Sequence, residues 1–423
     1  MFFLYLADIL FLNHRAKNMK KSVLIILLLP LLWYLLPKQK AVSDDIENIE
    51  KYIPALMQEA AIPGLAIAKI SDAKVTFLQV YGKANVELNT SVTQDTLFNI
   101  ASISKPIMGL VLLQLVEQGK LALDRDINDY LPFKINNPHI THEKITLRHL
   151  VTHTSGIADY YDVDSYAINK DADISLEQHL KSLLTPTGKN YNQGQYFLNN
   201  VPGAKRKYSN LAAGLAGYLV EVTSGITLAE YSQQHIFQPL GMQHTSWLLH
   251  DLSLTQIAVP YEVEQCIPFL AICSDTESAE LNLFISHYFN PPSENKRFVA
   301  YPHFGNPQYP DGGIRSSIKD LSKLLVAVLE NKDALGNKLL SDAMYEEMLR
   351  LQLPKDISDK QRFFWRDNSM GLTGHMGTDL GVFTALYFDA NKKDGFIILM
   401  NRGMDNNAAI AMKKIANKLV AMQ

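Results

Sequence analysis

The sequence is poor in cysteine and in clustered positive charge. It has 423 residues, of which 2 are cysteines, Cys266 and Cys273. Its net charge at pH 7 is -3. Two cysteines exclude a cysteine-cluster metal site, and they are compatible with either a small-loop disulfide or two unpaired buried thiols. No run dense in lysine and arginine occurs. A nucleic-acid partner is therefore not expected, because phosphates favour a basic protein face.

The apolar run near the N-terminus is also shorter than a typical transmembrane helix. The apolar run at 22–36, SVLIILLLPLLWYLL, has 15 residues, whereas a comfortable span needs about 20. Lys20 and Lys21 precede it, and Lys38 and Lys40 follow it. This layout is typical of an export signal. We therefore expect a protein exported to a periplasmic or extracellular space, with 22–36 serving either as a cleaved signal peptide or as a membrane anchor.

Three short regions thus precede the body of the protein. They are an N-terminal extension with a basic region (1–21), the signal or anchor (22–36) and a linker (37–44). Within 45–423, each end contains a predicted β-hairpin: 64–70 with 74–82, and 381–389 with 396–401. Helices are expected at 45–60, 209–225 and 406–421. The pattern favours an α+β fold, with an antiparallel sheet formed by both chain ends, flanking helices and a mainly helical insertion at about 116–310.

An unusual lysine stands in the most apolar helical segment. Residues 98–120 are interpreted as a buried helix that opens with Ser102, Ser104 and Lys105, although lysine is among the residues least often buried without a partner. Ser102 and Lys105 are three apart, so they share a helix face. A desolvated lysine can activate a serine nucleophile. The pair therefore predicts covalent catalysis.

The spacing Ser-x-x-Lys is weak evidence by itself, because it occurs at four places. They are Ser71/Lys74, Ser102/Lys105, Ser293/Lys296 and Ser316/Lys319. The first lies in a predicted hairpin turn and the third in a polar loop. The fourth resembles a helix cap formed by Ser317 and Asp320. Only the second leads into a buried helix, which selects it as the functional pair.

Five sequence blocks then occur in a characteristic order. They are FNIASISKP (98–106), ITLRHLVTHTSGI (145–157), KYSN (207–210), YPDGGIRSSIKDLSKLL (309–325) and GHMGTDLG (374–381). From about residue 50 to 402 the chain resembles the serine β-lactamase-like hydrolases. The resemblance is to the branch with class C β-lactamases, D-alanyl-D-alanine carboxypeptidases, D-aminopeptidases and related esterases. It implies a β-lactamase/transpeptidase-like fold without a metal or organic cofactor.

The resemblance also implies a role for particular residues. The acylated serine, its activating partner and the proton-transferring tyrosine match Ser102, Lys105 and Tyr208. The substrate-binding positions match Asn210, His375, Gly377 and Thr378. The backbone N–H groups of Ser102 and Thr378 would form the oxyanion hole. Neither S-D-N nor K-T-G, which mark class A β-lactamases, occurs in the chain.

The chemistry of these side chains is compatible with those roles but leaves one choice open. A tyrosine can exchange a proton with serine only beside a cation such as Lys105, and either Tyr208 or Lys105 could be the base. Asn210 is expected to donate to a substrate carbonyl. His375 is expected to supply polarity or partial positive charge on the opposite wall.

Several similar patterns are given structural interpretations instead. Tyr-x-Asn recurs at Tyr288/Asn290 and His-x-Gly at His303/Gly305, both in an irregular segment where chance matches are expected. His149 and His153 have helical metal-pair spacing, but the sequence lacks the H-E-x-x-H glutamate and an evident third ligand. We therefore expect them to support the core or a loop. Gly312, Gly313 and Arg315 are expected to shape a turn near the site.

Two departures from the family pattern bear on the substrate. Met376 stands where many relatives carry threonine, so a hydroxyl that could bind a substrate carboxylate is missing. The run GTDLG also differs from the usual G-G-T-P-G-like sequence. The expected function is a serine hydrolase acting on amide, peptide, ester or β-lactam acyl groups, foremost D-amino-acid peptides or β-lactam-like compounds. The alternatives are a small-acyl carboxylesterase and a non-turning penicillin-binding or sensing protein. The partner is a small-molecule or peptide acyl substrate, and the oligomeric state stays open.

Overall fold

The computed structural model describes residues 49–140, 142–160, 165–264 and 298–422, and the backbone alone of 266–267 and 272–273. The predicted segments 1–21, 22–36 and 37–44 lie outside the described residues, as do Ser293/Lys296 and Tyr288/Asn290. Cys266 and Cys273 face each other across the paired strands β8 (Cys266–Ile267) and β9 (Ile272–Cys273). Their side chains lie outside the described residues, so both alternatives, a small-loop disulfide and two unpaired thiols, stay open.

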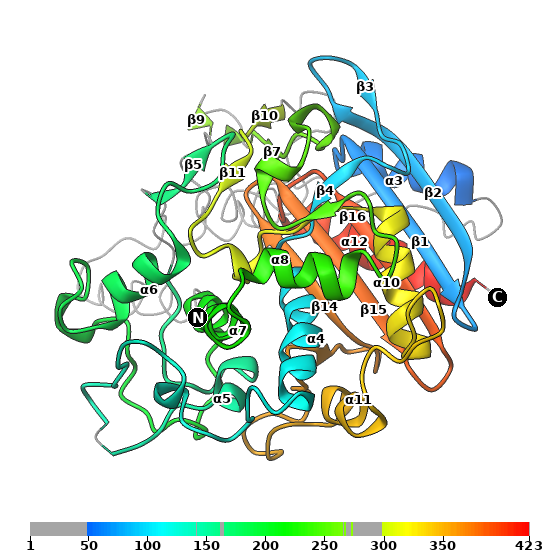
Figure 1. Ribbon diagram of the computed structural model, residues 1–423. Helices are drawn as coiled ribbons and strands as arrows, with labels where there is room; N and C mark the ends of the chain where they lie inside the picture. Colours follow the sequence, from blue (N-terminus) through cyan, green and yellow to red (C-terminus); the bar gives the residue numbers. More distant parts are fainter. Residues whose placement is uncertain are drawn as a thin grey trace, which may run out of the picture. The chain divides into compact units, whose positions relative to one another are not determined.

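A seven-stranded antiparallel sheet lies at the centre of the described part (Figure 1). Its strands, in spatial order, are β13 (Arg366–Asp367), β14 (Thr373–Asp379), β15 (Val382–Asp389), β16 (Asp394–Met400), β1 (Gly64–Ser71), β2 (Lys74–Asn85) and β3 (Thr90–Ser91). Strands β1 and β16 pair from Leu65↔Met400 to Ile70↔Gly395. The two ends of the sequence therefore meet in the middle of the sheet, which confirms the predicted α+β class and both hairpins.

The turn of the first hairpin follows from two residues. Asp72 and Ala73 have φ values of 49° and 53°. Left-handed backbone at both central positions matches the twist of a two-residue hairpin. The short turn fixes the register of β1 against β2, which begins at Ser71↔Lys74.

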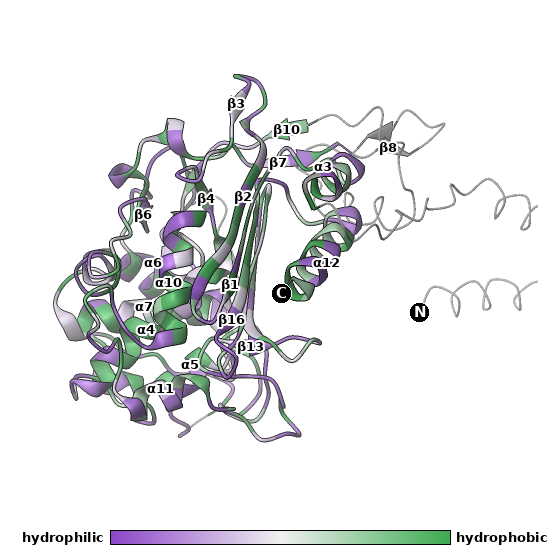
Figure 2. Cartoon of the chain, turned by 90° about the vertical axis from the view of Figure 1, so that its right-hand side faces the viewer, coloured by the Kyte–Doolittle hydropathy of each residue, from purple (hydrophilic) through white to green (hydrophobic). Residues whose placement is uncertain are grey.

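Alternating side chains of the central sheet place one large apolar core on each of its faces. In β1, Leu65 and Ile67 belong to one core, while Ala66, Ala68 and Ile70 belong to the other. The first core is covered by α3 (Ile49–Glu59) and α12 (Asn406–Ala421), which lie together on one face of the sheet (Figure 2). The second core is covered by α4 (Ser104–Glu117) and α10 (Ile318–Glu330) on the opposite face. The period-2 pattern of a strand buried on both faces thus explains the layers.

Within about 116–310, helices alternate with irregular segments and short strands. The helices are α5 (Leu147–Val151), α6 (Leu176–Leu184), α7 (Asn210–Ser224), α8 (Leu228–Ser232) and the π-helix η5 (Gln233–Phe237). The short strands are β5 (Ala167–Ile168), β6 (Thr245–Ser246), β7 (Tyr261–Val263), β10 (Phe298–Ala300) and β11 (Phe304–Gly305). Helix α7 confirms the helix expected at 209–225. A Cβ at Gly217 would lie 2.4 Å from Cβ of Pro310, so α7 packs closely against the segment that contains Asp311.

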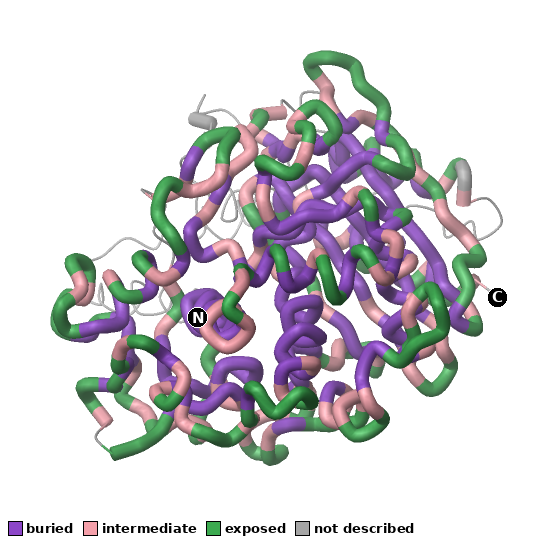
Figure 3. Tube along the Cα trace, in the orientation of Figure 1, coloured by how far each residue is buried: buried purple, intermediate pink, exposed green. Residues whose placement is uncertain are grey.

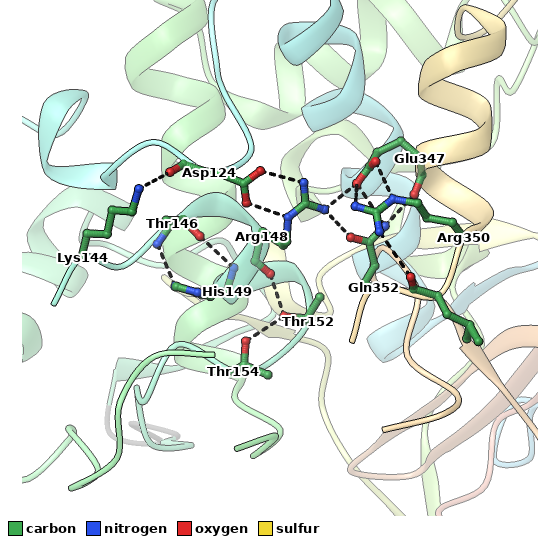
Figure 4. Close-up of polar contacts among 11 residues, drawn as sticks. Asp124, Lys144, Thr146, Arg148, His149, Thr152, Thr154, Glu347, Arg350 and Gln352 are labelled. Carbon is green, nitrogen blue, oxygen red and sulfur yellow. Dashed lines mark hydrogen bonds and ion pairs between the residues drawn. The ribbon is translucent and has the colours of Figure 1, made fainter. Parts of the chain in front are cut away.

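Arg148 joins this region to α11 (Asp342–Leu349) through a polar network (Figure 4). Its Nε donates to Asp124 Oδ1 at 2.6 Å, and its Nη1 donates to Glu347 Oε1 at 2.6 Å. The guanidinium therefore bridges two carboxylates that are far apart in the sequence, and both raise its pKa. Within the described part of the chain, no single helix is long and apolar enough to cross a membrane, although α7 and the next helical segment, Leu228–Phe237, pass that test as a pair bent by 78°.

Candidate active site

The segment that carries Ser102 differs from the continuous helix that we predicted. Residues Leu97–Asn99 form β4, which pairs with β12 (Arg315–Ser317). Ala101 then has φ of 47°, a left-handed conformation that an α-helix cannot contain. Ser102 lies in a one-turn 3₁₀ helix, Ala101–Ile103, and α4 begins only at Ser104. The prediction of a helix from residue 98 is therefore wrong, because pairing with β12 holds the first residues extended.

Lys105 is fully buried in the first turn of α4, whose trace is buried along most of its length in Figure 3. Its Nζ donates to Ser102 Oγ at 3.0 Å and to Asn210 Oδ1 at 2.6 Å. It also donates to the backbone oxygen of Asp311. An ammonium has three N–H donors, and each has an acceptor here. These contacts compensate a charge that would otherwise be costly in the interior.

Tyr208 lies on the other side of the serine. Its Oη donates to Ser102 Oγ at 3.0 Å, and the Lys105 Nζ lies 5.1 Å from the centre of its ring. The ring of His153 packs on the Tyr208 ring with centroids 4.3 Å apart. His153 Nδ1 also accepts from the backbone N–H of Ser209 at 3.3 Å. His153 therefore holds both the ring of Tyr208 and the backbone of the next residue in place.

The two histidines with metal-pair spacing have structural contacts instead. His149 Nδ1 accepts from the backbone N–H of Thr146, which completes a capping box at the start of α5. Burial lowers the pKa of His153 well below its usual value, so this ring is neutral. Among the described residues, no group of three or more metal-ligating side chains comes together.

Asn210, the first residue of α7, links Lys105 to a carboxylate at the cleft. Its Oδ1 accepts from Lys105, while its Nδ2 donates to Asp159 at 3.0 and 3.2 Å. Its backbone N–H also donates to Asp159 Oδ1 at 2.8 Å. Asp159 thereby sets the orientation of the amide. We expected Asn210 to donate to a substrate carbonyl, but the structure engages both ends of its amide within the protein.

Strand β14 passes beside the serine at a glycine. A Cβ at Gly377 would lie 2.3 Å from the backbone oxygen of Ile100 and 3.1 Å from Cβ of Ala101. Thr384 Oγ1 donates to the same Ile100 oxygen at 3.0 Å, which ties β15 to this segment. Only glycine allows so close an approach. It places Thr378, the next residue, at the rim of the cleft beside Ser102.

His375 contributes a neutral ring to the wall formed by β14. Its Nδ1 donates to the backbone oxygen of Met376 at 2.6 Å, which leaves Nε2 as an acceptor. Burial and the nearby Lys105 ammonium lower the pKa of His375 to about 3. The ring therefore supplies polarity but not the partial positive charge that we considered from the sequence.

Two clefts meet at the serine. One, with about 1320 Å³ of open space, is lined by Tyr208, Asn210, His375 and Met376. The other, with about 660 Å³, is lined by Asn99, Asp379 and Arg315. Ser102 and Thr378 line both. A substrate that spans the clefts would place its reacting carbonyl near these two residues.

Comparison with known proteins identifies the family of the chain. The model of the family described as Beta-lactamase matches residues 49–419. The chain belongs to the Beta-lactamase family.

Relatives in this family differ in their printed descriptions. Protein flp of Staphylococcus aureus strain N315 is 26% identical over 272 residues, which cover 62% of this chain and 52% of that protein. The chain thus spans about half the length of the curated relatives that it matches first. A β-lactamase of Yersinia enterocolitica is 28% identical over 354 residues, which cover 82% of this chain and 77% of that one. Membership therefore indicates a serine hydrolase type of function.

A solved structure supports the fold itself. The octameric penicillin-binding protein homologue of Pyrococcus abyssi has a TM-score of 0.64 with 24% sequence identity. The alignment covers 89% of this chain and 78% of that chain. The β-lactamase-family fold, with helices beside an antiparallel sheet, is thus common to both.

The structure brings together, around Ser102, the candidate catalytic and substrate-binding residues named in the sequence analysis. Ser102, Lys105, Tyr208 and Asn210 are linked by hydrogen bonds. His375 and Thr378 line the wide cleft, and Gly377 lies between them along strand β14. Sequence reasoning missed Asp159 and the backbone oxygen of Asp311. Both come from quoted or adjacent blocks, GIADY and YPDGG, but neither carried a signal that identified its partner.

Proposed function

We propose that the chain is an exported serine hydrolase that works through an acyl-enzyme on Ser102. The observation that carries the proposal is that Ser102 Oγ lies 3.0 Å from both Lys105 Nζ and Tyr208 Oη. A nucleophile within hydrogen-bond reach of a base and of a fixed cation is the arrangement that acyl transfer needs.

Tyr208 is the better candidate for the base. Lys105 Nζ lies within hydrogen-bond distance of Ser102 Oγ, Asn210 Oδ1 and the backbone oxygen of Asp311. An ammonium at this position donates to all three oxygens and has no lone pair for the Ser102 proton. In this proposed role Tyr208 is a phenolate beside that cation, so Ser102 Oγ donates the hydrogen bond to Tyr208 Oη and passes its proton there as Oγ bonds to the substrate carbonyl carbon. The backbone N–H groups of Ser102 and Thr378 are the proposed donors to the oxyanion that forms in this step.

The intermediate then collapses toward Tyr208. The bond between the carbonyl carbon and the leaving group breaks, and the Tyr208 proton passes to the leaving atom. Water then enters in place of the leaving group, and its oxygen bonds to the acyl carbon while Tyr208 takes one of its protons. The bond between the acyl carbon and Ser102 Oγ then breaks, and Tyr208 passes its proton to Oγ, which releases the acid and restores the serine.

The proposed substrates are D-amino-acid peptides or β-lactam-like compounds, within the broader set of amide and ester acyl donors. One observation favours a small-acyl carboxylesterase as a second candidate. Met376, which is 46% exposed, offers a thioether at the cleft where a hydroxyl could bind a terminal carboxylate. The proposed location is periplasmic or extracellular, supported by the charged flanks of the apolar run at 22–36.

Intact-mass measurement tests the proposal. The soluble part of the protein is incubated with a fluorophosphonate and, separately, with penicillin, as wild type and as Ser102→Ala. We expect an adduct on the wild type only, together with Ser102-dependent turnover. An unlabelled wild type would contradict the proposal, and an adduct that never turns over would instead support a non-turning penicillin-binding protein.

A further inference from the structure

Two exposed methionines line the wide cleft beside the serine. Met376 is 46% exposed and Met404 is 40% exposed. Met376 belongs to β14, and Met404 lies between β16 and α12. Single exposed apolar side chains are ordinary, but two in one cleft next to the proposed nucleophile offer a contact surface for a ligand. The long, flexible thioether of methionine adapts to ligands of different shape.

The strand register places Met376 on the face of the sheet that carries α12 (Figure 2). Met376 lies opposite Ala385, which belongs to the apolar core shared with α12. Cross-strand partners point to the same face. His375, the preceding residue, points to the other face, where its ring centroid lies 6.4 Å from that of Tyr208. Both His375 and Met376 line the wide cleft, so the cleft continues from the reacting groups around the edge of β14.

A tyrosine ring extends the apolar surface beside Met376. Tyr387 lies opposite Gly374, and a Cβ at Gly374 would lie 2.3 Å from Tyr387 Cδ1. The ring therefore lies over the backbone of β14 and lines the same cleft. Burial raises the pKa of Tyr387 to about 12, so its phenol is neutral. Arg366, opposite Gly374 on β13, also lines the cleft there, and the stem of an arginine is apolar.

The position of Tyr208 indicates which part of the substrate enters this cleft. Under the proposed mechanism, Tyr208 gives its proton to the leaving atom, so the leaving group must depart on the side where Tyr208 lies. Tyr208 is among the residues that line the wide cleft and is not among those that line the narrower one. The leaving group therefore faces the apolar wall formed by Met376, Tyr387 and Met404.

We propose that the apolar wall binds an apolar substituent of the leaving group. The preferred substrates are then acyl donors whose leaving group is an alcohol or amine with an aryl or branched alkyl substituent. The inference rests on the proposed function. Met376 and Met404 have no hydrogen-bond donor, so contact with them favours a substituent that gains by leaving water over a polar one of similar size.

Three esters of one acyl group test the proposal. They are the phenyl, 4-tert-butylphenyl and 4-(2-hydroxyethyl)phenyl esters, whose phenols have similar acidity, with the acyl group chosen as the better accepted of acetyl and N-acetyl-D-alanyl. The variants are Met376→Gln, Met404→Gln, the double variant and Met376→Leu. Met370→Gln is the matched control, because Met370 is 41% exposed and absent from the cleft lining. Thermal unfolding of each variant checks that it is folded.

The readout is the ratio of kcat/KM for each substituted ester to kcat/KM for the phenyl ester, which cancels effects common to both. For the wild type we expect a tert-butyl ratio of about ten, since the open cleft removes part of that group from water. Each Met→Gln change should lower this ratio about threefold, and the double variant should abolish the preference. Met376→Leu and Met370→Gln should keep it. The hydroxyethyl ratio should stay near one throughout.

Each outcome separates this inference from the function beneath it. Ser102-dependent turnover with no tert-butyl preference in the wild type, or with an unchanged ratio in the folded double variant, would overturn the apolar wall alone. An equal loss in Met370→Gln, or an equal preference for the hydroxyethyl ester, would also overturn it, since the contact would then not be specific to these methionines or to apolar groups. If none of the esters is turned over and Ser102 is not labelled by a fluorophosphonate, the proposed function itself fails.

Discussion

Replacement of Asp159 by asparagine tests the contact between Asp159 and Asn210, which the sequence motifs do not predict. Asp159 accepts from the backbone N–H and the side-chain Nδ2 of Asn210. The new side chain has nearly the same shape but carries an NH₂ group in place of one oxygen. That NH₂ would face the Asn210 NH₂ at the distance of 3.2 Å now bridged by a hydrogen bond. Either the new amide turns away or Asn210 turns its NH₂ toward the Lys105 ammonium.

The size of the effect follows from these contacts. A hydrogen bond to a charged group contributes about 1.5–3 kcal/mol, but Asp159 is an exposed residue, so solvent weakens the contact. We therefore expect the acylation barrier to rise by about 1.4 kcal/mol, which corresponds to an acylation rate about tenfold lower. The loss should fall on kcat, with little change in KM, because Asp159 acts through Asn210 on Lys105.

The assay is the rate constant for labelling of Ser102 by a fluorophosphonate, together with kcat and KM for an ester. Asp173→Asn is the matched control, since Asp173 lies in an exposed ion pair with Lys170. A double-mutant cycle with Asn210→Ala should show coupling close to the whole effect of Asp159→Asn. Labelling within twofold of the wild type, or simple additivity in the cycle, would refute this role.

Three further changes test other parts of the structure. Gly377→Ala should cost about 1–3 kcal/mol in unfolding free energy and sharply slow acylation, because the new Cβ would lie 2.3 Å from the Ile100 oxygen; an unchanged labelling rate would argue against the close approach. Arg148→Ala should lower the unfolding free energy by about 2 kcal/mol in a denaturant titration, since Glu347 is only 14% exposed and loses one of its partners; an unmoved midpoint would count against the network. The pKa of His375 is lowered to about 3, so the folded state binds fewer protons there than the unfolded state. Stability should fall as pH drops from about 6.5 toward 3, by about 1 kcal/mol at pH 5 after allowance for partial exposure, and His375→Asn should show a shallower decline.

Much of the fold could be predicted because it rests on local signals. The hairpins follow from β-prone runs separated by polar turns, and the final helix follows from its amphipathic spacing. The segment 98–103 was the exception. Its composition resembles that of a buried helix, but β4 pairs with β12, which lies more than 200 residues later, with Arg315 opposite Asn99. A long-range pairing of this kind overrides local propensity and leaves no trace in the local sequence.

The candidate site divides in the same way. Ser102, Lys105, Tyr208 and Asn210 could be selected because their motifs occur in a known order. Asp159 could not be selected, because its role depends on a hydrogen bond to Asn210, a residue 51 positions away. The neutral state of His375 also could not be predicted from the sequence, since it depends on burial beside Lys105.

The burial of Lys105 also explains why the proposed nucleophile, Ser102, depends on the whole fold. Its acceptors come from three separate segments: the turn before α4, the start of α7 and the backbone at Asp311. Until α7 and the Asp311 segment dock on α4, the ammonium lacks two of its partners, and an unpaired charge in the interior costs several kcal/mol. The close packing of Gly217 on Pro310 holds those two segments together. The contacts around the proposed nucleophile, Ser102, are therefore the same contacts that close the core, so a change that loosens α7 should impair acylation before it unfolds the sheet.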